Sequence, residues 1–153
     1  MRLRRYRTED LPILARLFGE TVRQVNCRDY TLPQVEAWAA GEADLLTRDS
    51  WFQRLYTLVA EAGGRIVGYG NVDDTGYLDH LFVRWDCQGQ GIAAALCDAL
   101  EAHCRELGVD AVTVHASKTA LPFFLGRGYA IEREQQVPCR GQVLTNYALE
   151  KIL

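Results

Sequence analysis

Long apolar runs are missing from this chain of 153 residues. A membrane-crossing helix needs about 20 consecutive apolar residues, and the first residues show no signal-peptide pattern. A basic surplus is missing as well, because 17 lysines and arginines stand against 20 aspartates and glutamates and the net charge is -3. Proteins that bind nucleic acid need such a surplus. We therefore expect a cytoplasmic protein with no membrane or nucleic-acid partner.

Metal-binding and redox patterns are also absent. The five cysteines form no C-x-x-C pair, and none of the three histidines has ligand spacing to a cysteine, so we expect no metal site. Cys97 and Cys104 stand seven residues apart in a helical pattern, which favours a role as small buried hydrophobes. The opening R-L-R-R-Y-R is locally basic, but it alternates like a short strand, so we expect a solvated strand face there.

Apolar patterns that are typical of regular secondary structure follow one another along the chain, over a length that suits one domain. Helical spacing predicts a long helix over Leu11 to Val25 and another over Ile92 to Leu107. Between them, three alternating segments predict consecutive antiparallel strands. The order β-α-α-β-β-β-α-β-α-β-β indicates an α/β (α+β) fold with a mixed sheet flanked by helices. The expected strands are 3–6, 56–62, 66–72, 77–83, 111–116, 129–137 and 143–149, with shorter helices near 32–39, 51–55 and 120–125.

Residues 88–93, reading Q-G-Q-G-I-A, stand between the last of these three strands and the second long helix. Glycines at a helix entry let a ligand approach the backbone, where free N–H groups converge at the positive end of the helix dipole. The segment therefore predicts a phosphate-binding site, although a glycine turn that merely opens the helix is an alternative. The spacing Gly89-x-Gly91-x-x-Ala94 also fits a dinucleotide fingerprint. That fold is disfavoured, because three antiparallel strands precede the loop and the next strand ends in Ser117 rather than in an acid.

The loop and its surroundings resemble the GNAT superfamily of acetyl-CoA-dependent N-acetyltransferases. The family motif Q/R-x-x-G-x-G/A follows a strand ending in L-x-V, and here Gln88, Gly91 and Ala93 follow Leu81-Phe82-Val83. Nearly the whole chain takes part in the resemblance, which implies a single acetyltransferase domain over residues 1–153. It also implies a mostly antiparallel, splayed central sheet of about seven strands flanked by about four helices. Further matches are Ser117, Ala120, Phe123-Phe124, Gly128-Tyr129 and the tail from Asn146 to Lys151.

By this resemblance, acetyl-CoA is the cosubstrate, and the N–H groups of the glycine loop bind its pyrophosphate. The pantetheine arm would pair with the strand edge at 81–83 as an added strand does, and the N–H of Phe82 or Val83 would polarise the thioester carbonyl. The implied contacts with acetyl-CoA are Leu81, Phe82, Val83, Gln88, Gly89, Gln90, Gly91, Ile92, Ala93, Ser117 and Phe124.

The general base is less clear from the resemblance. Tyr77 stands where many members of the family have a glutamate, so the usual base is replaced. Asp79 lies two residues further on and shares a face with Tyr77 in an ideal strand, so we predict Asp79 as the base or as the partner of the amine. The alternative is that Asp79 pairs with a basic neighbour such as Arg84. His80 points to the opposite face by alternation and is interpreted as a packing residue, unless a bulge re-aims it.

The general acid is the second open role. The usual acid is the tyrosine of the family's F-Y pair, and the matching residue here is Phe124, which has no proton to donate. Tyr147, Cys139 and His115 are possible substitutes, and Tyr129 is interpreted as packing. Alternatively no acid is required, because a CoA thiolate is a tolerable leaving group with a thiol pKa near about 8.5 by analogy with cysteine.

The acceptor is expected to be a small-molecule amine or a peptide. In the family it lies against the helices after the first strand and against the last hairpin. Aromatic side chains there could form its pocket, although aromatics on helices mostly pack against the sheet; they are Tyr30, Trp38, Trp51, Phe52 and Tyr56. Acidic side chains could attract a cationic amine, although charge on exposed helices is usually only solvated; they are Glu36, Glu42, Asp44 and Asp49.

The sequence therefore predicts an N-acetyltransferase that moves an acetyl group from acetyl-CoA directly to a primary amine. The alternative is a CoA-binding module with weakened catalysis and a sensing or assembly role, which Tyr77 and Phe124 favour. A dinucleotide-dependent oxidoreductase is the third and least favoured hypothesis. Apolar residues near the last strand edge, Val143, Leu144 and Tyr147, could support a homodimer.

Overall fold

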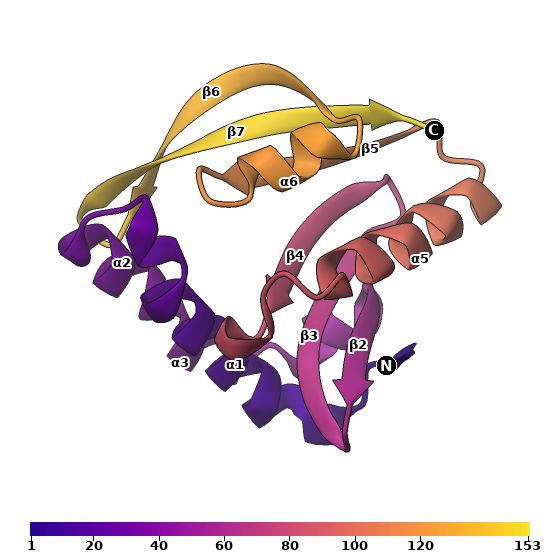
Figure 1. Cartoon of the computed structure of the whole chain (residues 1–153), viewed down its shortest axis with the longest axis horizontal. Helices are drawn as coiled ribbons and strands as arrows, with labels where there is room; N and C mark the ends of the chain where they lie inside the picture. The colour runs from indigo at the N-terminus through magenta and orange to yellow at the C-terminus, as the bar shows by residue number, and fades with distance from the viewer.

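Seven strands form one sheet in the order β1-β2-β3-β4-β5-β7-β6 in the computed structural model, which describes residues 1–153 (Figure 1). Every neighbouring pair is antiparallel except β4 and β5, which run parallel. The predicted mixed, mostly antiparallel seven-stranded sheet is confirmed. The strands are β1 (Arg2–Arg5), β2 (Tyr56–Ala62), β3 (Arg65–Val72), β4 (Tyr77–Val83), β5 (Ala111–Ser117), β6 (Ala130–Cys139) and β7 (Gln142–Ile152).

Helices cover both faces of the sheet (Figure 1). Six are α-helical, against five segments predicted from the sequence pattern and about four implied by the resemblance. The additional helix lies at Gly41–Leu45, directly after the second helix. Thr31 begins the second helix with a capping box, in which its hydroxyl accepts from the N–H of Gln34. The helices are α1 (Leu11–Gln24), α2 (Leu32–Ala39), α3 (Gly41–Leu45), α4 (Asp49–Arg54), α5 (Ile92–Glu106) and α6 (Leu121–Gly126).

Two apolar cores lie on the two faces of the sheet. One packs the buried face of α5 and α6 against the strands and includes Leu78, Leu96 and Leu149. The other packs α1 to α4 against the opposite face and includes Phe18 and Phe52. Cys97 and Cys104 are fully buried in the first core, as their spacing predicted. Leu144, which was expected at an exposed edge, is buried in the second core.

Close packing of α5 depends on two glycines in β3. A Cβ atom at Gly68 would lie 3.1 Å from a side-chain carbon of Ile92, and one at Gly70 would lie 3.2 Å from a side-chain carbon of Leu100. Both distances are shorter than ordinary van der Waals contacts, so the absence of side chains lets the helix approach the sheet. The first turns of α5, which follow the glycine loop, are thereby held at a defined place over β3 and β4.

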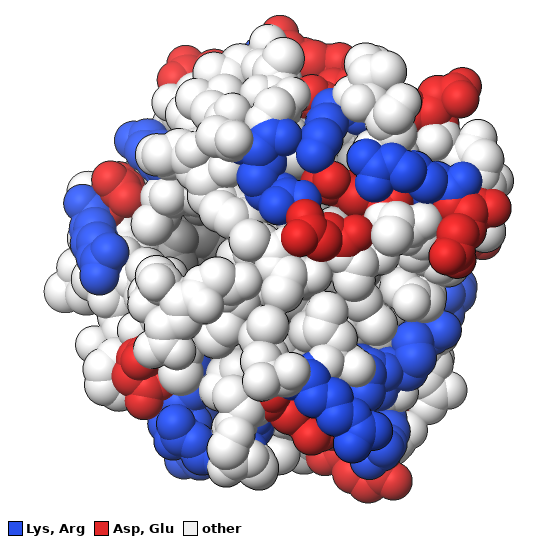
Figure 2. Space-filling model, turned by 45° about the vertical axis from the view of Figure 1, so that its right-hand side comes forward, with Lys and Arg blue, Asp and Glu red and all other residues white.

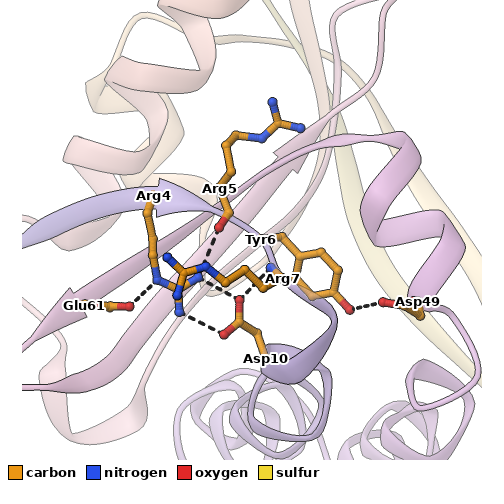
Figure 3. Close-up of polar contacts among 7 residues, drawn as sticks. All are labelled: Arg4, Arg5, Tyr6, Arg7, Asp10, Asp49 and Glu61. Carbon is orange, nitrogen blue, oxygen red and sulfur yellow. Dashed lines mark hydrogen bonds and ion pairs between the residues drawn. The ribbon is translucent and has the colours of Figure 1, made fainter.

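The basic N-terminal segment is anchored by charge pairs rather than being a solvated strand face. The guanidinium of Arg4 pairs with Asp10 at 2.8 Å and with Glu61, and its side chain is only 10% exposed (Figure 3). The Tyr6 hydroxyl donates to Asp49 at 2.7 Å, which connects the end of β1 to α4 (Figure 3). The prediction of a strand is confirmed, whereas the prediction of a merely solvated face is wrong for Arg4.

No helix has both the length and the apolar character that crossing a membrane requires.

Candidate active site

The two halves of the sheet separate between β4 and β5. These strands pair only at Tyr77 with Thr113 and at Leu78 with Val114, after which they diverge. A cavity of about 470 Å³ opens in the gap, lined mostly by hydrophobic residues of β4, β5, α6 and the first turn of α5. Figure 2 shows a hollow on a part of the surface that is largely uncharged. The splay expected from the family resemblance is therefore present, and it holds an apolar slot.

The glycine loop closes one end of this cavity. Gly89 and Gly91 have φ angles of +72° and +81°, in the left-handed region that favours glycine, and Gly91 caps the start of α5. The side-chain amide of Gln88 donates to the carbonyl of Val83 at 2.8 Å and so fastens the loop to the end of β4. Neither glycine would bring a Cβ atom within 4 Å of another group, so the space in front of the loop is open.

The N–H groups of the loop have no partners within the protein. No hydrogen bond is donated by the backbone of residues 88–91, and the first helical N–H with a partner is that of Ala95, which donates to Gly91 at 3.0 Å. The N–H groups that precede Ala95 in a helix cannot reach a carbonyl of the same helix. A row of free donors therefore stands at the positive end of a 15-residue helix, which is an arrangement suited to an anion such as pyrophosphate.

The edge of β4 forms one side of the slot and is interrupted by a β-bulge. Asn71 pairs with His80 and Val72 pairs with Leu78, so Asp79 is the extra residue without an opposite partner. Leu78 and Leu81 consequently both contact the core under α5, although they are three residues apart. The ideal alternation that the sequence suggested for this strand is therefore wrong at Asp79.

Asp79 lies on the cavity and makes no hydrogen bond or ion pair. Desolvation raises the pKa of its carboxyl group, and the nearby guanidinium of Arg48 opposes that rise. The alternative pairing with Arg84 is wrong, because Arg84 binds Asp86 instead at 2.6 Å. An unpartnered carboxylate with a raised pKa, at the point where the strands diverge, is suited to accept a proton.

His80 is a packing residue, as predicted, but the bulge determines which way it points. Its ring lies among Phe18 and Trp51, and its Nδ1 atom is 3.0 Å from the Tyr69 hydroxyl. Burial lowers the pKa of His80 to about 4, so the ring is neutral at pH 7.

Tyr77 stands outside the cavity lining, with its ring against His115 at 5.3 Å. Desolvation and the charge of Asp79 raise the pKa of Tyr77 to about 12, so its hydroxyl stays protonated at neutral pH and cannot accept the proton of the amine.

Ser117 and Phe124 both line the cavity, as the resemblance implies. The Ser117 hydroxyl accepts from the N–H of Ala120 at 3.1 Å, so it also fixes the start of α6. Phe124 is buried against Tyr129, whose hydroxyl donates to Glu101 at 2.8 Å. Tyr129 is thus confirmed as a packing residue.

Two other predicted residues lie away from the cavity. Gln90 is exposed and does not line it, unlike its neighbours Gly89 and Gly91. The Tyr147 hydroxyl is 3.3 Å from a carboxylate oxygen of Glu134 on the β6–β7 hairpin, outside the cavity. The structure therefore does not bring Tyr147 to the place where an acid is needed.

Of the aromatics considered for the acceptor pocket, only Trp38 lines the cavity. Trp51 and Phe52 are buried in the second core, and Tyr56 stacks on His103 at 3.6 Å. Tyr30 has a positioning role, because its hydroxyl donates to the carbonyl of Thr145 at 2.6 Å and accepts from the N–H of Lys118 at 2.9 Å. It thus connects the segment after α1 with β7 and with the end of β5, on the far side of the splay.

The end of α1 and the turn that follows it supply cavity residues that the sequence pattern did not single out. Thr21, Val25 and Asn26 line the slot, and the Thr21 hydroxyl donates to the carbonyl of Val83 at 3.0 Å. Their helical spacing was indistinguishable from that of ordinary core residues. His115, one of the possible acids, also lines the cavity and is exposed, whereas Cys139 does not line it.

A buried carboxylate on α5 joins the two halves of the sheet near a second, polar cavity. Glu101 is 2% exposed and accepts from Tyr129 and Lys151, each at 2.8 Å, while Arg127 lies 3.1 Å away. Burial alone would raise the pKa of Glu101, but these three donors outweigh it and lower the pKa. Sequence analysis did not identify this residue, because a glutamate on an amphipathic helix usually faces solvent.

Comparison with known proteins agrees with this arrangement. The family model of the GNAT acetyltransferase domain matches residues 26–151. The chain is 31% identical over 150 residues to the uncharacterized N-acetyltransferase YafP of Escherichia coli (strain K12), covering 96% of this chain and 93% of that protein. A crystal structure of a GCN5-related N-acetyltransferase from Rhodopseudomonas palustris superposes with a TM-score of 0.95 at 32% identity, covering 99% of this chain and 95% of that one.

A more distant neighbour shares the fold and contains coenzyme A. The PaiA N-acetyltransferase of Thermoplasma acidophilum, solved in complex with coenzyme A, superposes with a TM-score of 0.78 at 16% identity. The alignment covers 99% of this chain and 98% of that one. The parallel β4–β5 splay, the unpartnered amides of the glycine loop and the family match lead to one conclusion. The chain belongs to the GNAT family of N-acetyltransferases.

Proposed function

We propose that the protein transfers an acetyl group from acetyl-CoA directly to a primary amine, with Asp79 as the base. The observation that carries the proposal is the row of unpartnered N–H groups at residues 88–94, which opens onto the apolar slot between β4 and β5. An anionic diphosphate fits the amides, and an extended, largely apolar arm fits the slot. The unpaired edge of β4 supplies hydrogen-bonding groups along that arm.

The reaction needs three things from the protein at the point where the strands diverge. Asp79 accepts the proton that the attacking amine loses, directly or through a water molecule. A backbone N–H of Phe82 or Val83 stabilises the negative oxygen that forms when the nitrogen adds to the thioester carbon. The new C–N bond then remains while the C–S bond breaks, and the sulfur leaves as a thiolate that takes a proton from water.

No general acid stands on the cavity at the usual position, because Phe124 cannot donate a proton. We propose that the thiolate leaves unprotonated, since a thiol with a pKa near about 8.5 is a tolerable leaving group at neutral pH. The second candidate function, a CoA-binding module with weakened catalysis, is favoured by the same phenylalanine and by Tyr77 at the usual position of the base. Both functions require the glycine loop to bind coenzyme A.

Ligand stabilisation and turnover separate these possibilities. We expect acetyl-CoA to raise the Tm of the protein and NAD to leave it unchanged. Release of free thiol from acetyl-CoA in the presence of an amine panel then distinguishes the enzyme from the binding module. Stabilisation by NAD instead of acetyl-CoA, or thiol release with no amine requirement, would contradict acetyl transfer.

A matched pair of glycine variants tests the site itself. Gly91→Glu places a bulky acid in the loop and should abolish stabilisation by acetyl-CoA. Gly64→Glu is the control, because Gly64 has a similar positive φ of +75° in the β2–β3 turn and open space around it. Both variants carry the same backbone strain, so only the first should lose binding. Equal affinity of the two variants for acetyl-CoA would remove the loop from the site.

A further inference from the structure

The acidic side chains that could attract a cationic acceptor already have partners within the protein. Glu36 and Glu42 lie 3.8 Å and 3.5 Å from the guanidinium of Arg23. Asp44 pairs with Arg140, and Asp49 accepts from Tyr6 and from Gln53. These acids are therefore less available to attract a cationic amine, which was one possibility that the sequence left open.

Asp79 lines the cavity and makes no ion pair. Two positive residues beside the lining, Arg48 and Lys118, make none either, although neither lines the cavity itself. Arg48 stacks over the Trp51 ring at 4.9 Å, and Trp51 lies 5.0 Å from the ring of His80, the neighbour of Asp79. Arg48 is thus close enough to influence Asp79 but not close enough to pair with it.

Lys118 stands between Ser117 and Thr119, which both line the cavity. Its ammonium lies 5.5 Å from the ring centre of Tyr30. Tyr30 in turn contacts Trp38, which lines the cavity, at 5.6 Å between ring centres. A cation held by an aromatic ring alone keeps its hydrogen-bond donors free for a ligand.

From these unpaired charges we infer that the acceptor is an amine that also carries a carboxylate, as an amino acid does. Asp79 faces its amino group, and Arg48 binds its carboxylate, with Lys118 adding a second positive charge beside the cavity. The planar guanidinium matches a carboxylate through two parallel hydrogen bonds. This inference rests on the proposed acetyl transfer and names its substrate class.

The test uses acceptors that differ only in the negative charge. Thiol release from acetyl-CoA is measured with the standard amino acids and with the carboxamide of each. For the best acceptor we expect kcat/KM to be at least about tenfold higher for the acid than for its amide, the effect of one charge-assisted hydrogen bond. The difference should appear mainly in KM, because the carboxylate is bound before and during the transfer.

Variants then assign the preference to a residue. Arg48→Gln should reduce the acid-over-amide preference by about tenfold or more, and Lys118→Met should reduce it less. Arg54→Gln is the matched control, since Arg54 is an exposed arginine without an ion pair at the other end of α4, and it should leave the preference intact. The inference would be overturned if the amides are acetylated as efficiently as the acids and Arg48→Gln behaves like Arg54→Gln. Acetyl transfer itself would still hold in that case. Bound acetyl-CoA with no turnover of any amine would instead overturn the proposed function, and the inference with it.

Discussion

Two carboxylates at the junction of the half-sheets have opposite surroundings. Glu101 joins α5 to the β5–β7 half, where three donors surround it and its pKa is lowered. Asp79 lies where β4 leaves β5, has no hydrogen-bond partner, and its pKa is raised. The first carboxylate is stabilised in its charged form by the folded protein, whereas the second is destabilised in that form. A proton-accepting role fits only the second, and a structural role fits only the first.

The difference follows from where each residue stands in the fold. Glu101 faces the interior from the third turn of a helix, so its burial requires partners, and Lys151, Arg127 and Tyr129 supply them. Asp79 is the unpaired residue of a bulge beside an open cavity, so nothing forces it to be neutralised. The β4–β5 junction has only two strand-paired positions, and Glu101 and Tyr30 connect the halves on its two faces.

Replacing Asp79 should produce the largest effect on the reaction. Asp79→Asn keeps the size of the side chain and removes its basicity, so we expect kcat to fall by about 10²- to 10⁴-fold. The free energy of unfolding should not decrease at neutral pH, because the variant removes a carboxylate that the folded state disfavours. Initial rates of thiol release and urea unfolding measure the two effects. Asp74→Asn, at an exposed turn, is the control that should change neither.

The pH dependence sharpens the assignment of the base. Because the pKa of Asp79 is raised above its ordinary value of 3.8, the acid limb of kcat for the wild type should lie above that value. Asp79→Asn should lack this limb. A variant that keeps the rate of the wild type together with its acid limb would show that another group accepts the proton.

Replacing Glu101 should have the reverse outcome, with a large loss of stability and a small loss of rate. Glu101→Gln leaves Lys151 and Arg127 without their shared counter-charge, so we expect the free energy of unfolding to fall by about 3 kcal/mol. The rate per folded molecule should stay near that of the wild type at a temperature where the variant is folded. Glu106→Gln, exposed at the end of the same helix, is the matched control.

Acid titration separates the network of Glu101 from mere packing. Since the folded-state pKa of Glu101 is lowered, its contribution is present above the ordinary glutamate value of 4.5 and is lost as the pH falls through the folded-state pKa. The stability gap between wild type and Glu101→Gln should therefore narrow as the pH falls through this range. A gap that stays constant with pH would mean that the charge of Glu101 does not stabilise the fold.

Sequence patterns predicted the features that depend on neighbouring residues. The alternation of β2 to β4 and the paired glycines before α5 are local signals, and the structure has both. The bulge at Asp79 depends on its register with Asn71 in another strand, so no pattern within β4 could reveal it. The burial of Glu101 likewise depends on Arg127 and Lys151, which lie 26 and 50 residues away in the chain. A charged residue without an ion-pair partner, such as Arg48, can be identified only from the structure, because the sequence does not show which charged residues pair with one another.

Replacing Tyr147 should have the smallest effect and tests the rule that partnered groups outside the cavity take no part in the chemistry. Its hydroxyl lies beside Glu134 on the exposed hairpin, so Tyr147→Phe should change the free energy of unfolding by no more than about 0.5 kcal/mol. The rate and its pH profile should match those of the wild type. Steady-state kinetics over a range of pH measure the rate and the pH profile. Phe124→Leu is the comparison variant, because it changes a side chain that lines the cavity. If Tyr147→Phe loses the alkaline limb of the rate, its hydroxyl protonates the thiolate, and the separation between partnered and unpartnered groups fails for this residue.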